Sequence, residues 1–321
     1  MTETSYPYAV GRIKVQETHL LDRSKWNRLW EADETEALKL LDEIGYGADA
    51  PGSHTLEDLI NTELKNAREL INTITPDRIL TDLLLIPTDV HNIKIILKGQ
   101  LQRVEVDNLL LDGGSIPLDV LKKALEHGDY TLLSESFRAP LKKLEDEENP
   151  RTISLVVDEA AYTHIMSVLS KHKNPLLQEY YQAKIDFTNI LTVLRVTILK
   201  WDSYKVKPLL LKGGEIAEGV LLDSVGIPAE QLAKQLGHGS HSVLIKNLLE
   251  KYAQDHNLSE IEQKFEDASF AIIHEKRNDS FGIGPIANYL FQRFSEGKAL
   301  RVMFAGKRAG VKIPLSDLGI V

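Results

Sequence analysis

The sequence predicts an all-α protein, and three observations support this prediction. Apolar residues recur at the spacing of one helix face along most of the chain. Alternating apolar and polar residues, which would indicate strands, are hard to find. Prolines stand at or just before the starts of predicted helices, where a missing amide hydrogen costs little. These prolines are Pro76, Pro87, Pro117, Pro175, Pro228 and Pro285.

The clearest predicted helix covers residues 55–75, where Thr55 is placed to cap the first turn. Two more helices are predicted on either side of Pro87, over residues 77–86 and 88–101. The same periodicity predicts helices over residues 118–127, 157–172, 175–201, 228–236, 241–256, 259–276 and 285–305. Residues 142–151 (KKLEDEENPR) are the best candidate for a linker, although a solvated helix end would explain their polarity equally well.

The chain contains an internal repeat. DVHNIKIILKG from Asp89 resembles DFTNILTVLRV from Asp186 and, more loosely, EGKALRVMFAGK from Glu296, so the copies begin 97 and 110 residues apart. The fourth position is asparagine in the first two copies and alanine in the third: Asn92, Asn189 and Ala299.

A second repeated element follows the first. IPLDVLKKALEHG from Ile116 matches IPAEQLAKQLGHG from Ile227, and glycine pairs at 113–114 and 213–214 lie between the two elements. In both copies a histidine precedes glycine, at His127 and His238, which is typical of a helix C-terminus. The repeats predict three helical modules, over residues 1–117, 118–226 and 227–321.

The repeated polar residues are the first candidate site. Residues three apart are neighbours on a helix, so Asp89 with Asn92 and Asp186 with Asn189 each form a polar cluster beside an apolar stripe. Buried polar pairs need hydrogen-bond partners, so we expect each pair to tether a neighbouring loop or helix end. The alternative is a polar ring that faces a partner, to which Glu296 of the third copy would contribute.

Composition and charge exclude several classes of protein. The chain has no cysteine, which excludes disulfides, thiolate nucleophiles and cysteine-ligated metals. With 38 Lys and Arg against 47 Asp and Glu, the net charge of −9 repels phosphate backbones, so nucleic acid is not an expected partner. The start of the sequence does not resemble a leader peptide, and no apolar run is long enough to span a membrane. We therefore expect a cytoplasmic protein without a transmembrane segment.

No motif indicates catalysis, a cofactor or a metal. His238 and His241 lie three residues apart, but the glutamate of an H-E-x-x-H motif is missing. FGIGPIA (281–287) has the glycine spacing of a dinucleotide-binding turn, but the polar KRNDS precedes it where such a turn needs a strand. A helical metal-dependent hydrolase would need facing clusters of His and Asp, and no His-Asp dipeptide occurs. We therefore predict no catalytic, cofactor-binding or metal-binding residues.

A basic segment closes the sequence. From residue 298 onward there are five Lys or Arg residues and one acidic residue, within a chain that is acidic overall. Arg301, Lys307 and Arg308 are therefore candidates for docking an acidic protein partner. An ordinary basic helix end would explain the segment equally well.

Strings along nearly the whole chain resemble the C subunits of prokaryotic V-type (A/V-type) rotary ATPases, a family related to the d subunit of the eukaryotic V-ATPase. They are YAVGRIKV (8–15), LLDEIGYG (40–47), TDVHNIKIILKG (88–99), PLLLKGGEI (208–216) and the closing FGIGPIANYLF and ALRVMFAGKRAGVKIP. Their order and spacing make the resemblance specific. Two positions differ from the pattern: Val10 stands where the family often has Asn, and Ala299 replaces Asn in the third repeat.

The resemblance implies a funnel-shaped body of three similar helical modules around a pseudo-threefold axis. It also implies a non-catalytic rotor protein on the cytoplasmic face of the membrane rotor ring, where it would receive the central shaft made by the D and F subunits. Such a protein transmits torque between ATP hydrolysis and the transport of protons or sodium. The alternative is a helical-repeat scaffold that binds other protein partners.

Overall fold

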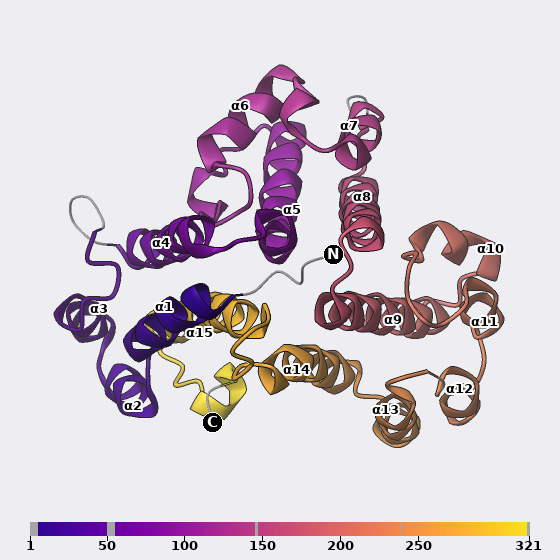
Figure 1. The fold of residues 1–321 in the computed structure, drawn as a ribbon. Helices are drawn as coiled ribbons and strands as arrows, with labels where there is room; N and C mark the ends of the chain where they lie inside the picture. Colours follow the sequence, from indigo (N-terminus) through magenta and orange to yellow (C-terminus); the bar gives the residue numbers. More distant parts are fainter. Residues whose placement is uncertain (1–5, 50–54, 145–146, 238, 320–321) are drawn as a thin grey trace. The chain divides into compact units, whose positions relative to one another are not determined.

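The computed structural model describes residues 6–49, 55–144, 147–237 and 239–319, and the regular elements of these residues are all helices (Figure 1). The prediction of an all-α fold is confirmed. The chain forms two compact units. One comprises Met1–His127 together with Lys276–Val321, and the other comprises Gly128–Glu275. The first unit therefore contains both ends of the chain, while the division into three modules stays a prediction.

The first unit is built from seven α-helices within the described residues. They are α1 (Pro7–Gln16), α2 (Arg23–Glu31), α3 (Glu34–Glu43), α4 (Leu56–Ile74), α5 (Arg78–Gln102), α6 (Leu118–His127) and α15 (Gly284–Arg308). The unit also contains three short 3₁₀ helices: Glu17–His19 and Asp107–Leu109, which lie between α-helices, and Leu315–Leu318, which follows α15.

The second unit also consists of helices in its described part. They are α7 (Glu135–Lys142), α8 (Pro150–Lys171), α9 (Pro175–Ile198), α10 (Ser203–Val206), α11 (Glu218–Asp223), α12 (Ala229–Leu236), α13 (Ser242–Asp255) and α14 (Leu258–Glu275). Two 3₁₀ helices, Tyr130–Leu132 and Lys207–Leu209, complete the unit. The predicted linker, residues 142–151, joins α7 to α8 within this unit, and its residues 145–146 lie outside the described part of the chain.

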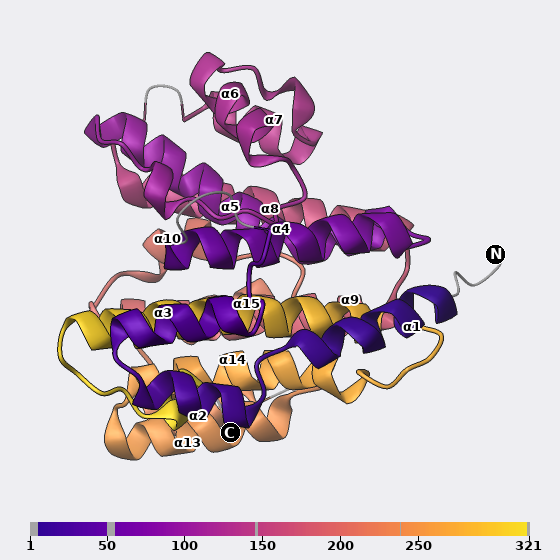
Figure 2. The ribbon, with the colours of Figure 1, turned by 90° about the vertical axis from the view of Figure 1, so that its left-hand side faces the viewer.

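The core of the first unit lies where α4 and α15 pack together with α2 and α3. Trp26 of α2 and Leu41 of α3 meet Phe304 of α15 in one buried apolar cluster. Helix α1 packs along α15 and α4 through Ala9 and Ile13 (Figure 2). Apolar side chains thus fix the chain's first described helix against its last long helix.

The core of the second unit is centred on α9, which packs against α8 and α14. The ring of Phe187 in α9 stacks on that of Phe265 in α14, with 4.3 Å between the ring centroids. Val157 and Ile165 of α8 are fully or almost fully buried. A helix such as α9, which buries residues all around its circumference, is typical of the centre of a helical unit.

The predicted helix starts are largely confirmed. Thr55 caps α4 in a capping box with Asp58. Pro175 and Pro285 lie in the first turns of α9 and α15, and Pro228 is the residue before α12. The strand that a dinucleotide-binding turn would need before FGIGPIA is replaced by helix α14 and a turn.

The predicted break at Pro87 is wrong, because α5 runs unbroken from Arg78 to Gln102. Pro87 lacks a backbone donor, which weakens one turn of the helix. The proline itself is exposed, whereas Ile86 and Thr88 beside it are buried. Burial on both sides of the proline holds the two halves as one helix, so tertiary packing overrides the local signal.

Three helices near the start of the chain, α1 to α3, were not predicted from periodicity. They are only 10, 9 and 10 residues long, and α2 buries just Trp26 and Leu29. A stripe of two or three apolar residues is too short to stand out as periodic. Among the described residues, no helix combines the length and the hydropathy needed to cross a membrane.

Candidate functional site

The first polar cluster lies on α5, in the first unit, and both predicted residues belong to it. The Asp89 carboxylate accepts hydrogen bonds from the backbone N–H of Ser115 at 3.0 Å, from its hydroxyl at 2.5 Å, and from the N–H of Ile116 at 3.3 Å. The Asn92 amide donates to the carbonyl oxygen of Leu111 at 2.8 Å and accepts from the N–H of the same residue at 2.9 Å. The two side chains tie the loop between α5 and α6 to the helix.

The second polar cluster, on α9 in the second unit, has the same local design. Asp186 accepts from the backbone N–H groups of Glu215 at 2.9 Å and Ile216 at 3.1 Å. Asn189 donates to the carbonyl oxygen of Leu211 at 2.9 Å and accepts from its N–H at 2.8 Å. The sequence repeat is therefore a repeat of hydrogen bonding, with each Asn–Leu pair exchanging two bonds as neighbouring strands do.

The glycine pairs between the repeated elements allow the carboxylates to approach. A Cβ atom on Gly114 would overlap the Oδ1 atom of Asp89, and one on Gly214 would overlap Oδ1 of Asp186. The preceding Gly113 and Gly213 have φ angles of +87° and +108°, which side chains disfavour. Each loop thus needs its first glycine for backbone conformation and its second for space.

Burial controls the ionisation of these carboxyls. Asp89 and Asp186 are 3% and 5% exposed. Loss of hydration raises the pKa of Asp89 to about 6, against the hydrogen bonds from Ser115 and Ile116, which lower it. Burial also raises the pKa of Asp186, although the N–H groups of Ile216 and Glu215 oppose the shift. All of these partners are backbone groups or hydroxyls of the same loop, as expected for a tether.

The third copy of the repeat, on α15 in the first unit, also binds a leucine N–H, but through a different side chain. Glu296 accepts from the backbone N–H of Leu21 at 2.5 Å. Leu21 is the second residue after the 3₁₀ helix Glu17–His19, just as Leu111 and Leu211 follow the 3₁₀ helices of the other clusters. The side chain of Ala299 cannot accept a hydrogen bond, and the longer side chain of Glu296 instead accepts one from the N–H of Leu21, which stands in the equivalent position.

Charge surrounds Glu296, which distinguishes it from the two aspartates. Arg293 donates to Glu296 at 3.0 Å and lies 3.2 Å from a carboxylate oxygen of Glu63 in α4. Arg293 and Glu296 are both buried. Burial raises the pKa of Glu296 to about 7, although Arg293 and the Leu21 N–H lower it. Periodicity does not reveal this network, because Leu21 and Glu296 are 275 residues apart.

The basic residues proposed for docking all have partners within the first unit. Arg301 donates to Oε2 of Glu57 at 2.8 and 2.9 Å and to Oε1 at 3.2 Å. Lys307 donates to the carbonyl oxygens of Trp30, at 3.1 Å, and Ala32, at the end of α2. Arg308 pairs with Glu34 at 3.2 Å and is the most exposed of the three. Their role in docking stays a prediction, and Lys307 has a structural role as well.

The predicted helix end at His127 is confirmed. The Nδ1 atom of His127 lies 2.8 Å from the carbonyl oxygen of Lys123 in the last turn of α6. Its repeat partner, His238, lies outside the described residues. His241 contacts the ring of Phe187, with 5.6 Å between the ring centroids. In the part of the chain that the structure describes, no three His, Asp or Glu side chains are grouped as a metal would need.

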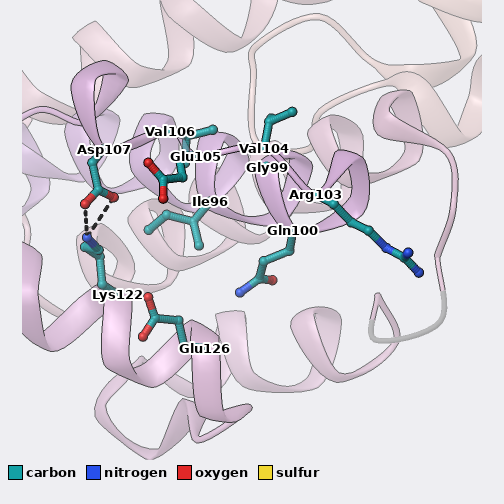
Figure 3. A pocket seen from close by; sticks show the side chains of 10 residues that line it. All are labelled: Ile96, Gly99, Gln100, Arg103, Val104, Glu105, Val106, Asp107, Lys122 and Glu126. Carbon is teal, nitrogen blue, oxygen red and sulfur yellow. Dashed lines mark hydrogen bonds and ion pairs between the residues drawn. The ribbon is translucent and has the colours of Figure 1, made fainter.

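A surface cavity of about 330 Å³ lies at the C-terminal end of α5 (Figure 3). Lys122 forms an ion pair with Asp107 at 2.7 Å across one side of it, and Arg103 points away from that pair. The cavity is open to solvent, and its other charged lining residues are Arg103, Glu105 and Glu126. We assign no ligand to it.

A comparison with protein families covers nearly the whole sequence. A sequence profile described as "ATP synthase (C/AC39) subunit" matches residues 9–312. The chain belongs to the ATP synthase (C/AC39) subunit family. The match extends over nearly all of the described residues, in both units.

Named relatives agree with this family. The C subunit of the A-type ATP synthase of Thermococcus onnurineus is 26% identical over 94% of this chain and 86% of its own length. The protein of the same name from Methanosarcina barkeri is 20% identical over 96% of this chain and 90% of its own. The C subunit of the V-type sodium ATPase of Enterococcus hirae is 25% identical over 68% of this chain and 67% of its own.

Two of the strings that carried the family resemblance contain residues of the first two polar clusters. TDVHNIKIILKG includes Asp89 and Asn92, and PLLLKGGEI includes Leu211 and both glycines of the second loop. In this protein, residues of these strings form hydrogen bonds between loops and long helices. They therefore have a structural use that geometry explains without a ligand.

Proposed function

We propose that the protein is a non-catalytic central-stalk subunit of a V-type (A/V-type) rotary ATPase. In this role it links the shaft made by the D and F subunits to the membrane rotor ring, so that torque from ATP hydrolysis drives the transport of protons or sodium. The observation that carries the proposal is the family match over residues 9–312. The names of the relatives, which are C subunits of A-type ATP synthases and of a V-type sodium ATPase, support it.

The polar clusters suit a part that transmits force. The buried acceptors of Asp89, Asp186 and Glu296 are occupied by groups of their own unit. Their role in the proposal is to tether loops to the long helices, rather than to face a partner. Satisfied buried networks favour one packing arrangement, and a torque-bearing part benefits from that stiffness.

The proposed architecture is three related modules around a pseudo-threefold axis, forming a funnel. The recurrence of one hydrogen-bond pattern on α5 and α9, with a variant on α15, supports it. The position of Leu21 implies that the two ends of the chain close the third module together. The proposed third module would therefore include residues from the start of the chain, such as Leu21, in addition to residues 227–321.

The proposed location is the cytoplasmic face of the membrane, held there through the rotor ring. No helix of the described residues is suited to cross a bilayer, which fits attachment through partners. Arg301, Lys307 and Arg308 are proposed docking residues, and the exposure of Arg308 makes it the best of the three to test.

A co-migration experiment tests the proposed function. The purified full-length chain is mixed with the D–F shaft of its own complex, with the isolated rotor ring, or with both, and the mixtures are separated by size. We expect binding to each and a ternary assembly with both. The isolated chain should hydrolyse no ATP. Failure to bind either the shaft or the ring, or ATP hydrolysis that survives repurification, would contradict the proposal.

A further inference from the structure

The segment that contains α2 and α3 is bound at both of its ends to carboxylates on long helices of the first unit. At its start, the backbone N–H of Leu21 donates to Oε1 of Glu296 in α15. At its end, the backbone N–H of Gly47 donates to Oε1 of Glu63 in α4 at 2.8 Å. These two hydrogen bonds enclose residues 21–47, which we call the α2–α3 segment.

One guanidinium joins the two carboxylates. Arg293 of α15 donates from Nη1 to Oε2 of Glu296 at 3.0 Å, and its Nη2 lies 3.2 Å from Oε2 of Glu63. Each carboxylate thus binds the guanidinium with one oxygen and a backbone N–H of the α2–α3 segment with the other. A guanidinium has only donors, so Arg293 acts on the two N–H groups through the carboxylates.

Two tyrosines complete the surroundings of Arg293. The ring centroids of Tyr46, in the turn after α3, and Tyr289, in α15, lie 6.0 and 5.6 Å from the guanidinium. The Nε atom of Arg293 also donates to the hydroxyl of Tyr289 at 3.3 Å. Burial raises the pKa of both tyrosines, so Glu63 and Glu296 are the groups around Arg293 that can change charge near neutral pH. Without Arg293 they would be two like charges with no cation between them.

The α2–α3 segment has few apolar anchors of its own. Helix α2 buries Trp26 and Leu29, and α3 buries Ala37 and Leu41, whereas α4 alone buries seven residues. Parts of a protein with few buried apolar contacts open at a lower free energy than the whole, and they often open as one supersecondary unit. The hydrogen bonds at the two ends therefore contribute a large share of what holds this segment closed.

We propose that Arg293 couples the two ends of the α2–α3 segment, by positioning Glu63 and Glu296 so that both ends are held or released together. Because the bonds of a buried network strengthen one another, release of one end weakens the other. The segment then opens as one unit while α4 and α15 stay folded, and Arg293 is the positioning residue that controls the opening. This coupling lies within the first unit and is independent of the proposed function, so its test needs no partner protein.

The test measures hydrogen exchange of individual backbone N–H groups in the full-length chain by NMR, corrected for the intrinsic exchange rate at each pH. Arg293→Met removes the guanidinium and keeps an unbranched side chain. The N–H groups of Leu21 and Gly47 should both exchange at least about tenfold faster in this variant. Glu63→Gln keeps an acceptor for Gly47 but removes the charge that faces Arg293. It should speed the exchange of Leu21 at least about threefold, although Glu63 is not the acceptor of the Leu21 N–H.

A matched control and a pH comparison separate coupling from packing. Arg301→Met removes another arginine that joins α15 to α4, through Glu57, and should change both exchange rates by less than about twofold because this ion pair is partly exposed. Without Arg293, protonation of the carboxylates relieves their repulsion. The difference between Arg293→Met and the unmodified protein should therefore be larger at about pH 8 than at about pH 5. A role in packing alone would give the same difference at both pH values.

Three results would overturn the coupling. In the first, Leu21 and Gly47 exchange no faster in Arg293→Met than in Arg301→Met. In the second, Glu63→Gln leaves the exchange of Leu21 unchanged, which would make the two ends independent. In the third, the effect of Arg293→Met is the same at both pH values. If Arg293→Met does not fold, Glu63→Gln, which nearly keeps the shape of the side chain, decides through the exchange of Leu21 alone.

Discussion

A single buried amide joins a loop to a long helix in each unit. Asn92 and Asn189 both offer a donor and an acceptor, and the backbone of one leucine uses both. An ionised aspartate in the same position could accept but not donate, and a leucine could do neither. The sequence pattern predicted that these pairs would need partners. It did not identify Leu111 or Leu211, because hydrogen bonds across a loop leave no periodic signal.

Replacing Asn92 by Ala should destabilise the first unit. The change removes both partners of Leu111, and leaving a buried backbone group unsatisfied costs about 1–3 kcal/mol. We expect the free energy of unfolding to fall by roughly 2 kcal/mol or more. Chemical denaturation checks this, with Asn108→Ala, at an exposed position in the same connection, as the control. Equal stability of the two variants would show that the amide is not a tether.

The buried carboxyl of Glu296 should make stability depend on pH. Its pKa is raised from 4.5 to about 7, mainly by burial, so the folded protein holds this proton more tightly than the unfolded chain does. The stabilisation is therefore complete below about pH 4.5 and is lost as the pH rises through 7, with a total on the order of 3 kcal/mol.

Glu296→Gln isolates this effect, because glutamine keeps an acceptor for the Leu21 N–H and cannot ionise. Denaturation at about pH 5 and about pH 8 should show a smaller loss of stability for the variant than for the unmodified protein. In both proteins the free energy of unfolding should still fall somewhat between these pH values, since burial also raises the pKa of Asp89, to about 6. Identical slopes would mean that Glu296 does not titrate in this range.

Between elements, the last turn of α15 holds the end of α2. The carbonyl groups at a helix C-terminus lack helical partners, and Lys307 donates to two of the carbonyls there. The basic composition of this segment was visible in the sequence. Its partners were not, because α2 is 275 residues or more away along the chain.

Lys307→Ala should lower the free energy of unfolding by about 1–2 kcal/mol, through the loss of charged donors to two carbonyl groups. Lys298→Ala changes an exposed lysine of the same helix and should have an effect within about 0.5 kcal/mol. Arg308→Ala should behave like this control, because its pair with Glu34 is solvent-exposed. A neutral Lys307→Ala would free this residue for a role purely in docking.

The elements also show where prediction from sequence succeeds. Long helices such as α4, α9 and α14 were predicted to within a few residues, since each is long and rich in apolar residues at helical spacing. The predicted break at Pro87 was wrong because the local sequence does not show that burial of the neighbouring residues keeps α5 continuous. Helices α1 to α3 were missed because their stability comes from packing on α4 and α15, with little periodic signal of their own.

At the scale of the whole molecule, three long helices share one repeated pattern of hydrogen bonding. Its copies on α5, α9 and α15 each fix a leucine N–H, through Asn92, Asn189 and Glu296. In the third copy the leucine comes from the start of the chain and the acid from near its end. This arrangement could not be predicted from the repeat alone, because the third copy lacks the asparagine and its loop lies before the helix in sequence.

An experimental structure of the assembled ATPase tests the central claim most directly. We expect the chain between the D–F shaft and the rotor ring, with α5, α9 and α15 related by successive rotations about the axis of the shaft. Asp89, Asp186 and Glu296 should occupy equivalent positions on these helices, each bound to its own loop. A chain located away from the rotor, or three helices in unrelated packing environments, would contradict the account.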